Sequence, residues 1–249
     1  MDCKIKYYEL KESHDYKVGE DILNKITVRT DIVVICNPNN PTGQLTDRNI
    51  MNAILERCHE VGAYLLIDEC FMDFIDMPRE YTMIKALARN KSLIILKAFT
   101  KTFAMPGIRL GYLMTSNSGL ISNLYEAGQD WNVSTVAQVA GIAATYETSY
   151  LNESHIVVNE ERTYLRAQLT NIGAKIYGSH ANYIFFKLKR PDNLVEDLRK
   201  QGYLIRSCAN YNNLGEGYYR VAVKTRVLNR GLIKAIKEAK KHAFFVNLD

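Results

Sequence analysis

A lysine and an arginine of this 249-residue sequence have the types and spacing that carbonyl chemistry needs. Lys101 follows the apolar run Leu93–Leu96 and stands among small and apolar residues, and Arg109 comes eight positions later. Desolvation in such surroundings would lower the pKa of a lysine amine and prepare it to form an imine with an aldehyde. A guanidinium group offers paired donors that suit a phosphate dianion. The stretch therefore indicates carbonyl chemistry beside an anion site.

Two further turns also follow apolar runs and carry polar residues. The loop Asn37–Gly43, with the sequence NPNNPTG, comes directly after Ile32–Cys36, and Asp68 with Glu69 comes directly after Tyr64–Ile67. Each has a plain alternative. The loop could act only as a turn, because its residues are common in turns, and Asp68 could act only as a cap of the next helix.

The elements that must position these residues are predicted from apolar patterning. Strands are expected at 32–36, 64–67 and 92–96, and the first is expected to be buried on both faces because its apolar run is continuous. Helices are expected between them, one beginning at Thr46-Asp47 and ending at Gly62, the other at 84–90. Alternating strands and helices are typical of a mainly parallel sheet, in which sites lie beyond the carboxyl ends of the strands.

The second half of the sequence changes to long helical patterns and then to a smaller α+β region. Helices are expected at 120–126, 134–146, 151–171, 192–201 and 227–243, and strands at 175–177, 183–186, 204–206 and 218–223. Trp131–Ser134 is interpreted as a packed loop before a helix. The charged helix over 151–171 would bridge two units, so we predict a large α/β domain at 1–148 and a small C-terminal α+β domain at 149–249.

Composition excludes several classes of protein. Hydrophobic residues make up 47% of the chain and charged residues 24%, which argues against disorder and fibrous repeats. The apolar runs fall far short of the roughly 20 residues of a membrane span, and the N-terminus has no signal-like pattern, so we predict a cytoplasmic protein without a membrane partner. The five cysteines are scattered, which favours reduced thiols over a disulfide frame or a zinc site, and no metal is expected.

The net charge of +5 leaves one alternative open. A basic chain can bind nucleic acid, but much of the excess lies in the last predicted helix, at Lys234, Lys237, Lys240 and Lys241. Cations near a helix C-terminus interact favourably with its dipole, and a nucleic-acid patch would need clustered cations with interleaved aromatic residues. We therefore interpret this face as solvated and expect no nucleic-acid partner.

The three polar turns, taken in order, resemble a known family. NPNNPTG, then DE-x-F from Asp68, then T-K-x7-R-x-G-Y from Thr100 are similar to the motifs of the class I/II pyridoxal-phosphate enzymes with the aspartate aminotransferase fold. The resemblance covers nearly the whole chain. It is strongest to the histidinol-phosphate aminotransferase and threonine-phosphate decarboxylase branches, and the segments 68–74, 205–211 and 217–223 look more like the decarboxylase branch.

The resemblance implies a role for each candidate residue and implies pyridoxal 5'-phosphate as the cofactor. Lys101 would hold the cofactor covalently and move a proton at the substrate Cα, and Asp68 would pair with the pyridine nitrogen. Asn40 would donate a hydrogen bond to the ring oxygen. Arg109 would bind the cofactor phosphate with help from Thr100.

Two arginines are implied as substrate ligands. Arg220 would bind the substrate α-carboxylate, although it could instead pair with Glu216 or Glu238. Arg206 is a candidate for a distal phosphate of the substrate, although it could instead form an ion pair at the rim. The implied function is transamination or decarboxylation of a phosphorylated amino acid or amino alcohol by a homodimer.

Two features depart from the family pattern. Phe71 stands where the family commonly has a tyrosine, which removes a phenol that would contact the cofactor and favours the decarboxylase branch. The phosphate-binding loop and helix that family members carry near the N-terminus are not found before Asn37, so the large domain is expected to be N-terminally incomplete. A catalytically incompetent fragment of such an enzyme is the alternative function.

Overall fold

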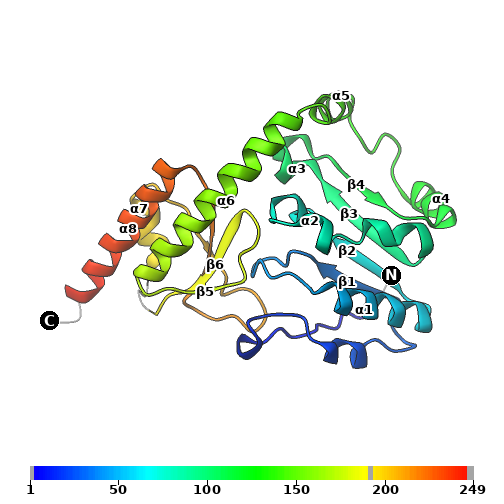
Figure 1. Cartoon of the computed structure of the whole chain (residues 1–249), viewed down its shortest axis with the longest axis horizontal. Coiled ribbons are helices and arrows are strands. Elements are labelled where there is room, and N and C mark those ends of the chain that lie inside the picture. The colour runs from blue at the N-terminus through cyan, green and yellow to red at the C-terminus, as the bar shows by residue number, and fades with distance from the viewer. Residues whose placement is uncertain (1–2, 190–192, 246–249) are drawn as a thin grey trace. The chain divides into compact units, whose positions relative to one another are not determined.

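The computed structural model describes residues 3–189 and 193–245, and these residues form two compact units (Figure 1). The parallel-sheet unit comprises Val18–Asn39 and Leu45–His155. The C-terminal unit comprises the residues from Ile156 onward, Asn40–Gln44 and the segment that ends at Lys17. These units are defined by their internal contacts, so two N-terminal segments group with C-terminal residues. The linear division into domains 1–148 and 149–249 stays a prediction.

The parallel-sheet unit is built on four strands, in the spatial order β1-β2-β3-β4. Their bounds are β1 Ile32–Cys36, β2 Tyr64–Asp68, β3 Leu93–Ala98 and β4 Gly111–Met114. The first three pair in parallel, as the alternation of strands and helices predicted, and β4 joins β3 in the antiparallel direction. In the register, Cys36 lies opposite Asp68, so the carboxyl ends of β1 and β2 meet at one edge of the sheet.

The helices of this unit begin and end largely at the predicted signals. Their bounds are α1 Arg48–Val61, α2 Pro78–Tyr81, α3 Phe99–Thr102, α4 Ser118–Ala127 and α5 Thr135–Ala144, and α6 Thr148–Asn171 runs from this unit into the other. The Asp47 side chain accepts a hydrogen bond from the Asn49 N–H at the start of α1, and Gly62 ends that helix in the left-handed conformation. The segment Ile84–Arg89, predicted as a helix, forms a 3₁₀ helix.

The prediction that β1 is buried on both faces is wrong. Ile32 is 47% exposed and Val34 is 62% exposed, whereas Ile35 is buried. β1 lies at the edge of the sheet order, and alternate side chains of a strand point to opposite faces, so only one face of β1 is covered within the described chain. The continuous apolar run predicted that both faces of β1 are buried, but the described residues bury only one face.

The C-terminal unit contains an antiparallel sheet, in the order β5-β6-β8-β7, with its own core. Its elements are β5 Lys175–Tyr177, β6 Tyr183–Lys187, α7 Leu194–Lys200, β7 Arg206–Ser207, β8 Tyr218–Ala222 and α8 Arg226–Phe245. Leu165 and Leu169 of α6, Ile184 and Phe186 of β6, and Ile236 of α8 are buried in one hydrophobic cluster. These elements confirm the predicted α+β pattern. Among the described residues, no helix is both long and apolar enough to cross a membrane.

An N-terminal segment packs on this sheet through the buried ring of Tyr16 and through the carboxylate of Glu12. Glu12 accepts hydrogen bonds from the hydroxyls of Tyr177 and Tyr218 (2.6 Å for Tyr218), and the ammonium groups of Lys175 and Lys187 lie 3.0 Å away. These donors hold the pKa of Glu12 far below its ordinary value. We call this set the Glu12 cluster. It fixes the start of the chain to strands more than 160 residues later in the sequence.

Candidate active site

The carboxyl ends of β2 and β3 carry the predicted cofactor residues of the parallel-sheet unit. Asp68 is the last residue of β2, and Lys101 belongs to α3, the single helical turn that follows β3 directly. The two strands are parallel neighbours, so both residues belong to the same edge of the sheet, where sites of such folds lie. The Cys70 N–H donates to Asp68 Oδ1 at 2.9 Å, which fixes one carboxylate oxygen.

Lys101 is exposed, so the prediction that its surroundings desolvate it is wrong for this structure. Thr102 of the same turn is buried, because a short helix has one inner and one outer face. Lys101 Nζ lies 5.8 Å from the centre of the Phe71 ring, within the range of a cation–π contact. The residue that departs from the family pattern is thus adjacent to the candidate reactive amine.

Arg109 and Thr100 occupy the loop region around this turn. Arg109 is exposed, and its Nη1 donates to the Pro106 carbonyl at 3.1 Å. Its φ of 59° and the φ of 52° at Ala104 are both in the left-handed region, which residues other than glycine seldom adopt. Such strain tends to gather at functional loops. Thr100 is half-buried and has no hydrogen-bond partner for its side chain within the described chain.

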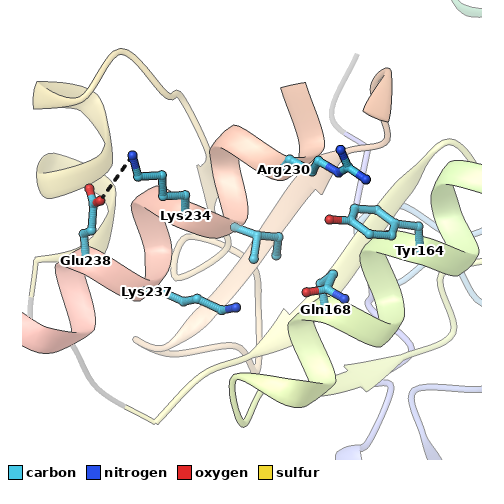
Figure 2. Close-up of a pocket in the computed structure, with 7 residues that line it drawn as sticks. Tyr164, Gln168, Arg230, Lys234, Lys237 and Glu238 are labelled. Atoms are coloured by element: carbon cyan, nitrogen blue, oxygen red, sulfur yellow. Dashed lines mark ion pairs between the residues drawn. The ribbon is translucent and has the colours of Figure 1, made fainter. Parts of the chain in front are cut away.

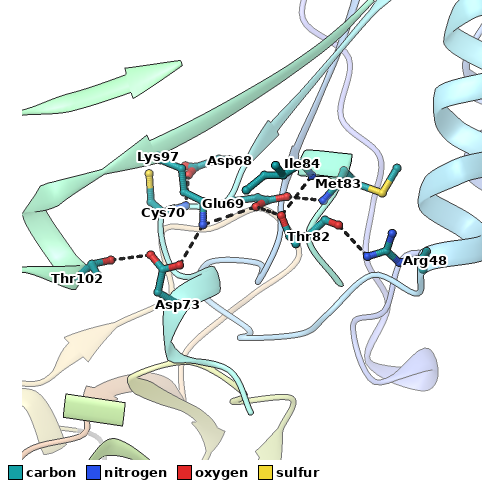
Figure 3. A network of polar contacts seen from close by, with 10 residues as sticks. All are labelled: Arg48, Asp68, Glu69, Cys70, Asp73, Thr82, Met83, Ile84, Lys97 and Thr102. Carbon is teal, nitrogen blue, oxygen red and sulfur yellow. Dashed lines mark hydrogen bonds and ion pairs between the residues drawn. The ribbon is translucent and has the colours of Figure 1, made fainter. Parts of the chain in front are cut away.

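A buried ion network, which the sequence analysis missed, lies beside these residues (Figure 3). Lys97 Nζ is 3.1 Å from Asp73 Oδ1 and 3.7 Å from Glu69 Oε2. Glu69 also accepts hydrogen bonds from the Thr82 hydroxyl at 2.7 Å and the Met83 N–H at 2.9 Å. The available signal was a lysine inside the apolar strand 93–98, because a buried cation needs a carboxylate partner.

Two cysteines flank Asp68. Cys36 Sγ lies 4.0 Å from Asp68 Oδ2, and burial raises the pKa of Cys36 to about 11, with the charge of Asp68 adding to the effect. Burial and a contact with Asp68 raise the pKa of Cys70 to about 12. Both thiols therefore stay protonated at neutral pH and can donate to the carboxylate. All five cysteines are free, as predicted, and the described residues hold no cluster of three or more side chains suited to a metal ion.

Asn40 and Arg220, both of the C-terminal unit, are brought together. Arg220 Nη1 donates a hydrogen bond to Asn40 Oδ1, so the amide nitrogen of Asn40 remains available as a donor. The Arg220 guanidinium also lies 5.0 Å from the centre of the Tyr183 ring. Within the described chain, no ion pair joins Arg220 to Glu216 or Glu238, the two partners considered from the sequence.

The loop that carries Asn40 is fixed by a close backbone contact. The Ser179 N–H donates to the Thr42 carbonyl at 3.0 Å, and the His180 N–H donates to the Gly43 carbonyl at 3.1 Å. Gly43 has a φ of 67°, and a Cβ there would lie 2.7 Å from Ser179 Cα. Only glycine fits this position without displacing the backbone. The NPNNPTG loop is therefore a positioned element rather than a plain turn.

Arg206 lies directly opposite Arg220 in the antiparallel pairing of β7 with β8. Residues opposite each other share one face of a sheet, and like charges in such pairs are unfavourable. Arg206 is exposed and forms no ion pair with any residue that the structure describes, so the rim ion pair considered from the sequence is not seen. The register thus sets two arginines at opposite positions of neighbouring strands, and neither forms an ion pair with a carboxylate of the described chain.

A surface pocket of about 520 Å³ also belongs to the C-terminal unit (Figure 2). It lies between α6 and α8 and is lined by Tyr164, Gln168, Arg230, Ile233, Lys234, Lys237 and Glu238. Lys234 and Glu238 form an exposed ion pair at 3.9 Å. None of the candidate residues lines this pocket. Lys234 and Lys237 are exposed, as the solvated face predicted for the last helix requires, whereas Lys240 is half-buried and donates to the Ile172 carbonyl at 2.6 Å. The side chain of Lys241 lies outside the described residues.

Comparison with known proteins supports the resemblance. The family of class I and II aminotransferases matches residues 1–236. Threonine-phosphate decarboxylase of Salmonella typhimurium is 34% identical over 94% of this chain and 65% of its own length. Histidinol-phosphate aminotransferase of Methanocaldococcus jannaschii is 27% identical over 95% of this chain and 63% of its own length. The chain therefore spans slightly less than two thirds of these relatives.

Solved structures agree with the sequence relatives. The histidinol-phosphate aminotransferase from Clostridium acetobutylicum matches with a TM-score of 0.88 and 30% identity, over 94% of this chain and 70% of that one. An aspartate aminotransferase from Thermus thermophilus shares the fold, with a TM-score of 0.76 at 22% identity, over 91% of this chain and 61% of that one. These matches confirm the predicted α/β fold of the aspartate aminotransferase type, and the chain belongs to the class I and II aminotransferase family.

Proposed function

We propose that this chain acts with pyridoxal 5'-phosphate on a phosphorylated amino acid or amino alcohol. The observation that carries the proposal is the opposition of Arg206 and Arg220 on β7 and β8. Two cations on one face without a carboxylate partner suit a ligand with two anionic groups. An α-carboxylate bound by Arg220 and a phosphate bound by Arg206 would relieve the repulsion between them. The names of the two curated relatives refer to phosphorylated compounds of this kind.

The residues at the sheet edge fit the cofactor. Bound pyridoxal phosphate would supply a conjugated ring that accepts the electron pair released at the substrate Cα. The exposed amine of Lys101 would hold the cofactor aldehyde and then return a proton to Cα. Asp68 would keep a proton on the ring nitrogen. The family resemblance, rather than the sheet edge, assigns the contact with the ring oxygen to the amide nitrogen of Asn40. Arg109 and Thr100 would bind the cofactor phosphate.

Decarboxylation is the favoured reaction of the two. Phe71, adjacent to Lys101, has no hydroxyl to donate to the cofactor, unlike the tyrosine that is common in the family. The identities of the curated relatives differ little on this point, since the decarboxylase from Salmonella typhimurium has 34% identity to the chain and a histidinol-phosphate aminotransferase from Desulfitobacterium hafniense has 32%. In decarboxylation the Cα–carboxylate bond breaks, CO₂ leaves, and the Cα takes up one proton, which Lys101 would deliver.

Substrate assays on the purified chain with added cofactor test the proposal. We expect CO₂ release from O-phosphothreonine, and none from the Lys101→Ala variant. Glutamate formation from histidinol phosphate and 2-oxoglutarate would instead assign transamination. Cofactor binding without either product would favour the alternative that the chain is a catalytically incompetent fragment, and no binding would contradict the proposal.

A homodimer is part of the proposal. Helix α5 exposes Val136, Val139 and Ile142 while burying Ala137 and Gly141, so it is apolar on both sides. A helix that is apolar all round needs a second covering surface. Trp131, which was expected to pack in its loop, is 96% exposed, so that expectation is wrong and the residue adds to the apolar surface.

Light scattering on the chain and on a Val139→Glu variant tests this assembly. We expect a dimer for the former and a monomer for the latter, and equal masses would contradict the assigned surface. The cytoplasmic location stays a prediction from the sequence.

A further inference from the structure

The Glu69–Lys97–Asp73 network reaches the sequence neighbours of both candidate cofactor residues. Glu69 directly follows Asp68 at the end of β2, and Thr102 directly follows Lys101 in α3. The Thr102 hydroxyl donates to Asp73 Oδ2 at 3.0 Å, while Lys97 Nζ lies 3.1 Å from Asp73 Oδ1 (Figure 3). One carboxylate therefore joins the strand β3 to the turn that carries Lys101.

The carboxylates of Glu69 and Asp73 differ in burial and in the groups that they contact. Glu69 is fully buried, and Lys97 is 8% exposed, so these two opposite charges compensate each other inside the protein. The Asp73 side chain is 44% exposed. If Asp73 is removed, Glu69 still compensates Lys97, and no buried charge is left without an opposite charge. Asp73 is thus dispensable for buried charge balance.

Within the described chain, Asp73, unlike Glu69, accepts a hydrogen bond from the Thr102 hydroxyl. Thr102 is the buried residue of α3, and its hydroxyl donates to Asp73 Oδ2. The Lys101 side chain is exposed and forms no hydrogen bond or ion pair with a described residue, although the Lys101 carbonyl accepts from the Ala104 N–H. Besides such backbone hydrogen bonds, the buried Thr102 hydroxyl is the side-chain group that ties this turn to Asp73.

We propose that Asp73 is a positioning residue that fixes Lys101 for its reaction with the cofactor, acting through the hydroxyl of Thr102. The inference rests on the proposed function, because it concerns the same amine. A turn held in one orientation keeps the amine close to the geometry that it needs to bind the aldehyde, and misplacement by small distances is costly in such reactions.

Two substitutions that each remove the hydrogen bond between Thr102 and Asp73 test the inference. Asp73→Ala removes the acceptor, and Thr102→Val removes the donor with little change of shape. Titration with pyridoxal phosphate, followed by the visible absorbance of the lysine-bound cofactor, gives a dissociation constant and the pH midpoint of the band. We expect each variant to raise the dissociation constant by about tenfold and to shift the pH midpoint.

The double variant and a conservative variant separate positioning from general damage. Because both substitutions break one contact, the double variant should be no worse than the worse single variant. Thr102→Ser keeps the hydroxyl and should remain within about twofold of the wild type. Glu56→Gln, an exposed carboxylate of α1 without a contact in the described chain, is the matched control and should have no effect.

The outcomes distinguish the two claims. If the wild type forms the lysine-bound band and Asp73→Ala and Thr102→Val have its dissociation constant, the positioning role alone is overturned. The same conclusion follows if the two substitutions raise the dissociation constant additively in the double variant. It also follows if Thr102→Ser binds the cofactor as weakly as Thr102→Val. A wild type that forms no lysine-bound band would overturn the proposed function and the inference with it.

Discussion

Two charged clusters of the C-terminal sheet are compensated in opposite ways. In the first, Glu12 is surrounded by two lysines and two tyrosine hydroxyls from β5, β6 and β8. In the second, Arg206 and Arg220 occupy opposite positions of β7 and β8, and neither forms an ion pair with a described carboxylate. The first arrangement satisfies its charges within the chain and holds a segment in place. The second lacks such compensation within the described chain, and we propose that a ligand supplies it.

The parallel-sheet unit shows the same contrast between two lysines that are four positions apart, Lys97 and Lys101. Lys97 is buried and paired with two carboxylates, whereas Lys101 is exposed and unpaired within the described chain. Residue type alone does not separate these two lysines. The comparison indicates that charges matched inside the chain support the structure, whereas the unmatched charges are those that we propose for the site.

The largest expected effect comes from removing a matched charge. Lys97→Met should lower the free energy of unfolding by about 3–5 kcal/mol, because Glu69 would stay buried without a cation. Lys101→Met, the matched control, should change it by less than about 0.5 kcal/mol, since that side chain is exposed. Urea unfolding measures both. Equal losses in the two variants would break the distinction between the lysines.

Removing an unmatched charge should weaken substrate binding without lowering stability. Arg206→Gln should weaken substrate binding on the order of ten- to a hundredfold, seen as a raised KM for O-phosphothreonine. It should leave stability unchanged or raise it by up to about 0.5 kcal/mol, because a like-charge pair is relieved. Arg199, which is paired with Glu196 at 2.8 Å, offers the control Arg199→Gln. A similar KM change in both variants would count against a specific phosphate ligand.

The Glu12 cluster predicts a pH dependence of stability. Folding lowers the pKa of Glu12 from its ordinary value of 4.5, first through the hydroxyls of Tyr177 and Tyr218. The stabilisation is therefore complete above about pH 4.5 and is lost as the pH falls further, because the unfolded chain then binds a proton that the folded chain does not.

A substitution at Glu12 measures this contribution. Glu12→Gln should cost about 1–2 kcal/mol at pH 7, since the carboxylate is partly exposed, and should flatten the stability profile between pH 5 and 3 on the order of that amount. The exposed Glu9 gives the control Glu9→Gln. An unchanged profile in Glu12→Gln would show that the cluster does not hold the segment.

The smallest expected effect concerns the cysteines. Burial raises the pKa of Cys36, Cys58 and Cys208 to about 11 and that of Cys70 to about 12, so few of these thiols are ionised at pH 8. Iodoacetamide at pH 8 should label the exposed Cys3 first, as read by peptide mass spectrometry. Rapid labelling of Cys70 in the folded chain would contradict the raised pKa of this thiol beside Asp68.

Local sequence predicted much of the fold, including the strands whose carboxyl ends precede the candidate residues Asp68 and Lys101. Apolar runs gave β1 to β3, and the signals at Asp47 and Gly62 gave the ends of α1, because these features depend on neighbours in the chain. The exposure of Lys101, the pairing of Lys97 and the packing of Glu12 depend on residues far away in the sequence. The antiparallel strand β4 was missed because Gly111–Met114 is short and has no alternating pattern.

The most direct test of the account is to find which lysine holds the cofactor. The chain is incubated with pyridoxal phosphate, reduced with borohydride and digested, and the modified peptide is identified by mass spectrometry. The account predicts modification at Lys101 and none at Lys97, since only the first is exposed and unpaired within the described chain. Modification at Lys97, or none at Lys101, would contradict it.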